Sequence, residues 1–154
     1  MEQHLNFIRQ TRKNFIQLLE RCSIEELNQV PEGFNNNIIW NFGHIITSQQ
    51  GLCYTLSGLT PKIAPSYINT YKKGTKPEVF IGQEEIDELK KLALSLIDEL
   101  EEDLKNQVFT GYNSFTTSYG VTLNTTQDAV QFFPIHDSYH YGCAWAIKRI
   151  ITKN

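Results

Sequence analysis

The chain has 154 residues, of which 40% are apolar and 20% charged, and its formal net charge is −3. This length suits a single domain over residues 1–154 that buries a core of its own. The small negative charge without a basic run argues against a nucleic-acid partner, and no stretch reaches the roughly 18–20 apolar residues of a membrane span.

The first predicted helix covers about 20 residues, in which apolar side chains recur at spacings of three or four: Leu5, Ile8, Phe15, Leu19 and Cys22. Ser23 and Glu26 then form a capping box for a short second turn of helix. The start of the chain is polar and has no apolar signal-peptide segment. The three cysteines show no close pairing and suit free thiols in a reducing compartment, so we expect a cytoplasmic protein.

The second predicted helix runs from about Asn36 to Ser57 and is apolar on several sides, which is typical of a central helix in a bundle. A thin polar stripe interrupts it at helical spacing: Asn37, Asn41, His44 and Ser48. Such a stripe on a buried helix either lines a cavity or forms hydrogen bonds inside the core.

A long connection follows over about residues 58–81, and it contains three prolines and the tyrosines Tyr67 and Tyr71. Loops of this length in a compact domain are often functional, so we expect it to act as a lid. The third predicted helix, about residues 83–104, is amphipathic, and its many acidic residues indicate a solvated outer face.

A small hairpin or irregular insertion is predicted over about residues 108–123, with its turn near Tyr119 and Gly120. The fourth helix covers about residues 126–152, and Pro134 inside it should bend or loosen it. Together these segments predict an all-α fold, an up-and-down four-helix bundle with a small insertion before the last helix.

Histidines carry the strongest functional signal. His136 and His140 are four residues apart on the inward stripe of the last helix, so both imidazoles lie on one face. A shared cation would satisfy two buried neutral rings at once. His44 alone is more often a hydrogen-bonded core residue, but its helix could reach the same core layer, where bundles commonly build metal sites.

Three neutral nitrogens suit zinc or nickel, with iron or manganese as further possibilities, and they leave a coordination position open for water or substrate. Asn41, Tyr67 and Tyr139 are candidates for the pocket around such an ion. Asp137 is adjacent to a ligand but about 100° round the helix, which favours the surface at least as much as the site. No catalytic residue is predicted.

Two segments, NNNIIWNFGHIITSQQGLCYTLSG and HDSYHYGCAWAIKRI, resemble the signature helices of the DinB-like superfamily of four-helix-bundle proteins. The segments LNQVPEGF and INTYKKGTKPEVF are also similar to that family. The resemblance implies a divalent metal site made by His44, His136 and His140, and it implies homodimers. Some relatives use the metal to activate a low-molecular-weight thiol, as S-transferases or as an isomerase, while many have no established activity.

One position departs from the family pattern, because Cys143 stands where a glutamine is usual. Cys143 lies one turn beyond His140, where it either packs or alters the pocket. Two functions stay open. The first is a metal-dependent S-transferase or hydrolase that acts on a small molecule, and the second is a non-enzymatic stress-response or small-molecule-binding protein with a structural metal.

Overall fold

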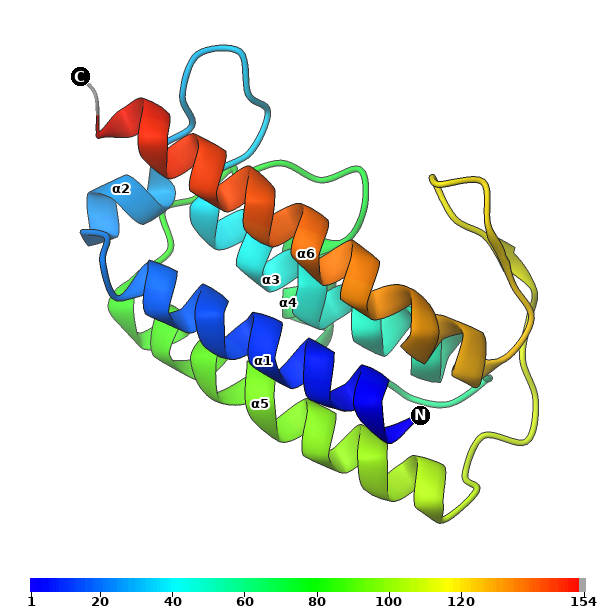
Figure 1. Ribbon diagram of the computed structural model, residues 1–154. Helices are drawn as coiled ribbons and strands as arrows, with labels where there is room; N and C mark the ends of the chain where they lie inside the picture. Colours follow the sequence, from blue (N-terminus) through cyan, green and yellow to red (C-terminus); the bar gives the residue numbers. More distant parts are fainter. Residues whose placement is uncertain (153–154) are drawn as a thin grey trace.

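The computed structural model describes residues 1–152, and its architecture is that of a helical bundle with one small hairpin (Figure 1). The elements in chain order are α1 (Glu2–Leu19), α2 (Ile24–Asn28), α3 (Ile38–Gln49), the π-helix η1 (Gln50–Thr55), α4 (Pro65–Tyr71), α5 (Gln83–Lys105), β1 (Phe115–Thr116), β2 (Thr122–Leu123) and α6 (Thr126–Ile151). The predicted all-α bundle is therefore confirmed. Within residues 1–152, no helix is long and apolar enough to cross a membrane.

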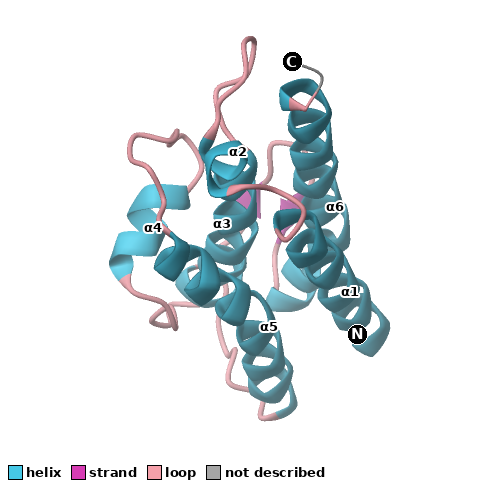
Figure 2. Cartoon of the chain, turned by 90° about the vertical axis from the view of Figure 1, so that its left-hand side faces the viewer, coloured by secondary structure: helices cyan, strands magenta, loops and turns pink. Residues whose placement is uncertain are grey.

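Four long helices form the bundle, and each packs mainly against two of the other three. α6 and α5 both pack against α1, and both also pack against α3 (Figures 1 and 2). The helices α1 and α6 run in one direction, whereas α3 and α5 run in the other (Figure 1). The directions thus do not alternate strictly along the chain, as an up-and-down order would require. The connection from α3 to α5 returns to the end of the bundle where α3 began.

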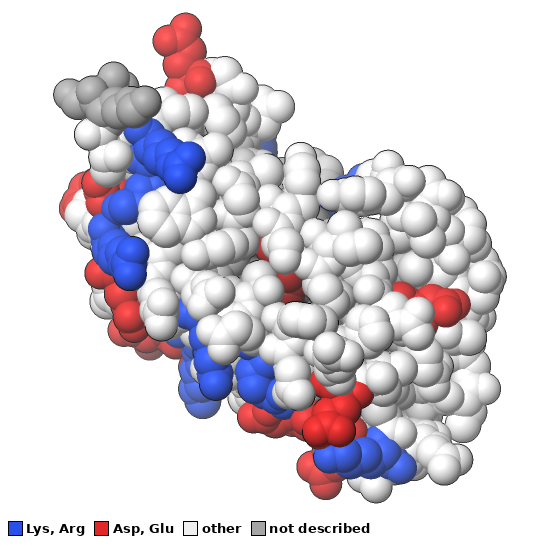
Figure 3. Space-filling view, viewed as in Figure 1, with Lys and Arg blue, Asp and Glu red and all other residues white. Residues whose placement is uncertain are grey.

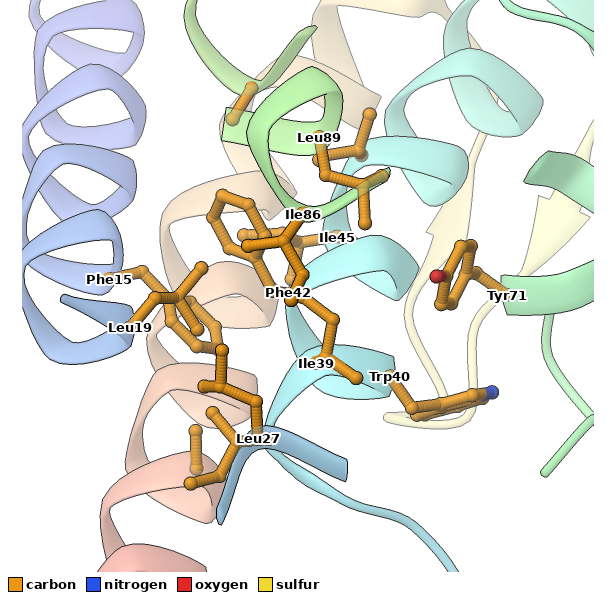
Figure 4. Packing of buried hydrophobic residues seen from close by; sticks show 14 of the residues in the cluster. Phe15, Leu19, Leu27, Ile39, Trp40, Phe42, Ile45, Tyr71, Ile86 and Leu89 are labelled. Carbon is orange, nitrogen blue, oxygen red and sulfur yellow. The ribbon is translucent and has the colours of Figure 1, made fainter. Parts of the chain in front are cut away.

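The core consists of two groups of buried apolar residues, one toward each end of the bundle. Phe15, Phe42 and Ile86 belong to the first group, where α1, α3 and α5 meet (Figure 4). The second group joins Leu5 of α1 with Phe133 of α6. These side chains fix the positions of α3 and α6, the two helices that carry the histidines.

Side-chain caps mark the starts of α2 and α6. Ser23 forms the predicted capping box with Glu26, and a second capping box precedes α6, where Thr125 pairs with Asp128. The hairpin pairs Phe115 with Leu123 in antiparallel register. α6 continues without interruption through Pro134.

Two segments differ from the sequence-based expectation. The second predicted helix becomes α-helix over Ile38–Gln49 and π-helix over Gln50–Thr55. A π-helix reaches five residues back for its hydrogen bonds, as the amide of Leu56 does to the carbonyl of Gly51 at 3.1 Å. The connection after it contains the short helix α4, which packs on α3 through the buried Tyr71. Figure 4 shows Tyr71 reaching α3 from the side opposite Phe15.

Gly43 permits this contact, and we expect Gly43→Ala to destabilise the protein by about 1–3 kcal/mol through overpacking. A Cβ at residue 43 would lie 2.5 Å from the ring of Tyr71. That ring cannot retreat easily, since its hydroxyl donates to Glu85 Oε1 at 2.6 Å. Urea unfolding monitored by circular dichroism measures the change.

Gly142→Ala is the matched control on α6. A Cβ there meets no atom within 4 Å, and alanine has the higher helix propensity, so this variant should be neutral or slightly more stable. Equal stabilities of the two variants would show that the close approach of Tyr71 to Gly43 is not a constraint.

Candidate metal centre

Three histidines from two neighbouring helices lie together. His44 comes from α3, and His136 and His140 come from α6. Their ring centroids are 5.3 Å apart for His44 and His136, 4.6 Å for His44 and His140, and 4.7 Å for the pair on α6. One nitrogen from each ring can be chosen so that all three lie within 4.8 Å of one another.

The imidazole of His44 is oriented by a backbone carbonyl. Its Nδ1 lies 2.7 Å from the carbonyl oxygen of Tyr71, at the end of α4. Because a carbonyl only accepts, Nδ1 carries the proton and Nε2 keeps its lone pair. The Ser48 hydroxyl, 3.3 Å away, donates to that Nε2. Trp40 stacks on the ring with centroids 4.7 Å apart and planes 9° from parallel, which fixes the ring plane.

The imidazole of His140 is oriented by Asn41. The Nδ1 atom lies 2.8 Å from Asn41 Oδ1. The amide nitrogen of Asn41 donates in the other direction, to Asn36 Oδ1 at 3.0 Å and to the carbonyl of Asn37 at 2.8 Å. These two bonds turn the oxygen of Asn41 toward the histidine, so Nδ1 of His140 donates and Nε2 is the free acceptor.

The imidazole of His136 is oriented by a buried carboxylate. Its Nδ1 lies 3.2 Å from Asp137 Oδ1, and the other oxygen of Asp137 accepts from Arg12 Nε at 3.0 Å. The side chains of Asp137 and Arg12 are both 0% exposed. A carboxylate behind a histidine fixes the tautomer and makes the opposite nitrogen a better metal ligand. The surface alternative for Asp137 is therefore wrong.

Arg12 donates four hydrogen bonds inside the bundle. Beyond Asp137, its guanidinium donates to Gln49 Oε1 at 2.7 Å and to the carbonyls of Ala93 at 3.1 Å and Ile45 at 3.3 Å. The amide of Gln49 donates in turn to the carbonyl of Leu96 at 2.7 Å. A buried ion pair is tolerated only with such compensation, and this one joins all four long helices behind the histidines.

The donor set fits a divalent metal ion. In each ring an acceptor engages Nδ1, which leaves Nε2 as the nitrogen that can bind a metal ion. One nitrogen of each ring lies within 4.8 Å of the other two, so the three rings are close enough together to share one ion. Within residues 1–152, the group contains no fourth His, Cys, Asp or Glu. Three protein ligands are the number found where a coordination position stays open to water or substrate.

Burial keeps the rings of His44 and His140 neutral. It lowers the pKa of His44 to about 4, against the smaller opposing effect of the bond to the Tyr71 carbonyl. Burial also lowers the pKa of His140 to about 2, with a further contribution from the charges that His136 and His44 would carry. Neutral imidazole is the form that binds metals.

These pKa values predict that the metal-free protein loses stability as the pH falls from 6.5 to 5. In the unfolded chain a histidine titrates near pH 6.5, so there the unfolded state takes up protons that the folded state does not. The two depressed pKa values thus contribute stability that is complete above pH 6.5 and declines below it. The loss by pH 5 is on the order of 2 kcal/mol for each histidine. Urea midpoints at several pH values, with a chelator present, measure it.

His44→Gln and His140→Gln should each flatten this pH dependence. Wild-type protein whose urea midpoint is the same at pH 6.5 and pH 5 would show that the two rings protonate in the folded state.

A cavity of about 420 Å³ lies between α3, α6, the hairpin and the turn after α4. All three histidines line it. Much of the remaining wall is apolar or aromatic: Trp40, Leu52, Ile68, Phe115, Tyr119, Phe132 and Tyr139. A small organic molecule can therefore reach the histidines while its apolar part leaves water.

The other residues singled out in the sequence fall in different places. Asn41 and Tyr139 line the cavity, and so does the half-buried Cys143, which stands outside the three-histidine group. Tyr67 packs instead against the hydrophobic core. Tyr71 is buried and takes part through its backbone carbonyl.

The sequence reasoning missed Arg12 and Gln49. Arg12 continues the apolar spacing of α1, four residues after Ile8 and three before Phe15. A charged residue on a buried stripe requires a buried partner of opposite charge, so the stripe itself contained the signal. Gln49 gave no comparable signal, because its neighbours are polar as well as apolar.

The fold and the site thus define a helical bundle with a three-histidine centre that could hold a metal ion. A model of the DinB superfamily matches residues 8–144, so the chain belongs to this superfamily. No curated protein matches the chain.

Proposed function

We propose that this protein is a metal-dependent enzyme in which His44, His136 and His140 hold a divalent ion beside the substrate cavity. The observation that carries the proposal is that the three clustered histidines all line one open cavity of about 420 Å³. A structural ion would instead be enclosed by four protein ligands. This difference favours the enzyme over the non-enzymatic alternative.

The ion, when bound, would lower the pKa of a thiol or of water and so supply a nucleophile at neutral pH. The protein's own residues do the rest. Asn41, Asp137 and the Tyr71 carbonyl hold the three rings in one tautomer. The Ser48 hydroxyl faces the same space and can donate a hydrogen bond to a bound group. The aromatic wall can hold the apolar part of a substrate beside the histidines.

The proposed reaction is the transfer of a low-molecular-weight thiol to a small electrophile, with hydrolysis by water as the second possibility. In the thiol reaction a sulfur–carbon bond forms, the leaving group departs with its bonding electrons, and the thiol proton is released. Zinc and nickel suit the three nitrogens best, and iron or manganese would also bind.

Metal-dependent turnover tests the proposal. Protein purified without an affinity tag is analysed for metal, stripped, reloaded with each of the four metals and assayed with a panel of thiols and electrophiles. We expect activity with at least one metal and none after stripping. A stably bound ion without turnover, and without any effect of thiols on the absorbance of cobalt-loaded protein, would favour the structural alternative.

We also propose a homodimer. The family resemblance supports it, and so do exposed apolar side chains on two neighbouring helices, namely Phe7 of α1 together with Ile135 and Ile150 of α6. Sedimentation equilibrium at micromolar concentration tests this. A mass near 17.8 kDa, that of one chain, would contradict it.

A further inference from the structure

The charged residues around the cavity, apart from the histidines, have one sign. Lys72 and Lys73 line it, whereas no Asp or Glu of residues 1–152 does. This bias is unexpected for a chain with 17 acidic and 14 basic residues. We propose, on the basis of the proposed function, that the small molecule bound here carries an anionic group, a carboxylate or a phosphate, which Lys72 and Lys73 recognise.

The turn that carries the two lysines is hydrogen-bonded at both ends to residues of α3, His44 and Trp40. Before it, the carbonyl of Tyr71 accepts from His44. After it, the hydroxyl of Thr75 accepts from Trp40 Nε1 at 3.0 Å. The turn is closed by the amide of Thr75, which bonds the carbonyl of Lys72 at 3.2 Å, and Gly74 supplies the required φ of +90°. The lysine backbone therefore keeps a defined position relative to His44.

Both lysine charges are available to a ligand. Within residues 1–152, neither lies within 4.0 Å of a carboxylate, and Lys72 has only a long bond of 3.4 Å to the neutral Asn69 amide. Lys62, in contrast, contacts both Glu99 and Asp103. An unpaired lysine pair beside a partly apolar cavity attracts anions more strongly than a pair that carboxylates already neutralise.

The hairpin, on the other side of the cavity, does not offset the positive charge of Lys72 and Lys73. The hairpin segment over residues 106–127 contains no charged residue. Figure 3 shows charged side chains gathered mainly along α1 and α5, while the surface over the hairpin is largely uncharged. The cavity therefore suits a molecule with three parts: a donor group toward the histidines, an apolar segment along the aromatic wall, and an anionic group at the lysines.

Binding of non-thiol probes to the metal-free protein tests the inference directly. Hexanoate, hexyl phosphate and hexanol are titrated against Trp145→Phe protein, whose remaining tryptophan, Trp40, lines the cavity and reports binding by fluorescence. We expect at least one anion to bind about tenfold more tightly than hexanol, and this preference should fall with added salt. The two anions show which anionic group is preferred.

The double variant Lys72→Gln/Lys73→Gln should lose the preference. Lys90→Gln/Lys91→Gln is the matched control, because it removes two adjacent charges from α5, where both already pair with neighbouring acids and neither lines the cavity. Equal binding of hexanol and both anions, or equal loss in the two double variants, would overturn the inference.

A second measurement separates this inference from the proposed function. Cobalt-loaded protein is titrated with 6-mercaptohexanoate and 6-mercaptohexanol, and the absorbance is followed. If both thiols act equally in wild-type protein and in Lys72→Gln/Lys73→Gln, the anion inference is wrong and thiol activation stands. If hexanoate or hexyl phosphate binds as expected while no thiol changes the spectrum, the lysine site stands and thiol activation is wrong.

Discussion

Replacing His140 with alanine is expected to reduce divalent-metal affinity by at least a thousandfold, so that the purified protein carries less than a tenth of the wild-type metal content. Two of the three nitrogens would remain, and two imidazoles compete poorly with water for a divalent ion. His136→Ala and His44→Ala should have effects of similar size, since each removes one member of the same set. Elemental analysis and competition with a chromophoric chelator measure content and affinity.

Two further variants should lose less metal affinity or none, and they test whether the effect is specific to the three histidines. Asn41→Ala leaves all three rings in place but removes the acceptor of His140 Nδ1, so affinity should fall by about 10–100-fold. His4→Ala changes a histidine of α1 outside the group and should change nothing. Full metal content in His44→Ala would show that the pair on α6 binds with some other partner.

Arg12→Met is expected to destabilise the protein by about 3–5 kcal/mol, because it leaves the Asp137 carboxyl group buried without its partner. Asp137→Asn should cost a similar amount, since it leaves the guanidinium unpaired. Both changes also disturb the orientation of His136, so metal affinity should fall together with stability. Urea unfolding of the metal-free variants isolates the effect on the fold.

The double variant Arg12→Met/Asp137→Leu separates the two roles of the pair. Apolar replacement of both partners should restore much of the stability, while His136 still lacks its carboxylate and binds metal weakly. Arg9→Met is the control on the same helix, because Arg9 pairs with Asp98 and Glu101 at the surface and should cost under about 1 kcal/mol. If Arg12→Met lowered the free energy of unfolding no more than Arg9→Met does, the buried pair would not contribute to the stability of the fold.

The local sequence pattern was sufficient to predict the bounds of α1, α5 and α6. The spacing of apolar residues in α1, α5 and α6 gave bounds close to those observed, and Ser23 marked a true capping box. These features depend on residues a few positions apart, which is the range that periodicity covers. The direction of α5 and the short helix α4 escaped this reasoning, because packing against α3 decides both.

The same limit applies to the candidate site. The pattern selected the histidines that the structure brings together, since His136 and His140 share a face and His44 stands on a polar stripe. The environment of Asp137 was not predictable from α6, because Arg12 on another helix determines it. The sequence predicted no role for Lys72 and Lys73, because two lysines in a polar loop are common. Only their position beside the cavity distinguishes them.

The position of α6 has a consequence for the order in which the molecule assembles. Asn41 and His140 are 99 residues apart in the chain, and Arg12 and Asp137 are 125 apart. During synthesis, α1, α3 and α5 all leave the ribosome before α6, so the nascent chain holds only one of the three site histidines, His44, and an unpaired Arg12 until α6 docks. Such distant contacts close late and slow folding relative to bundles built from neighbouring helices. A metal ion therefore cannot direct the early steps, because two of its three ligands arrive with the final helix.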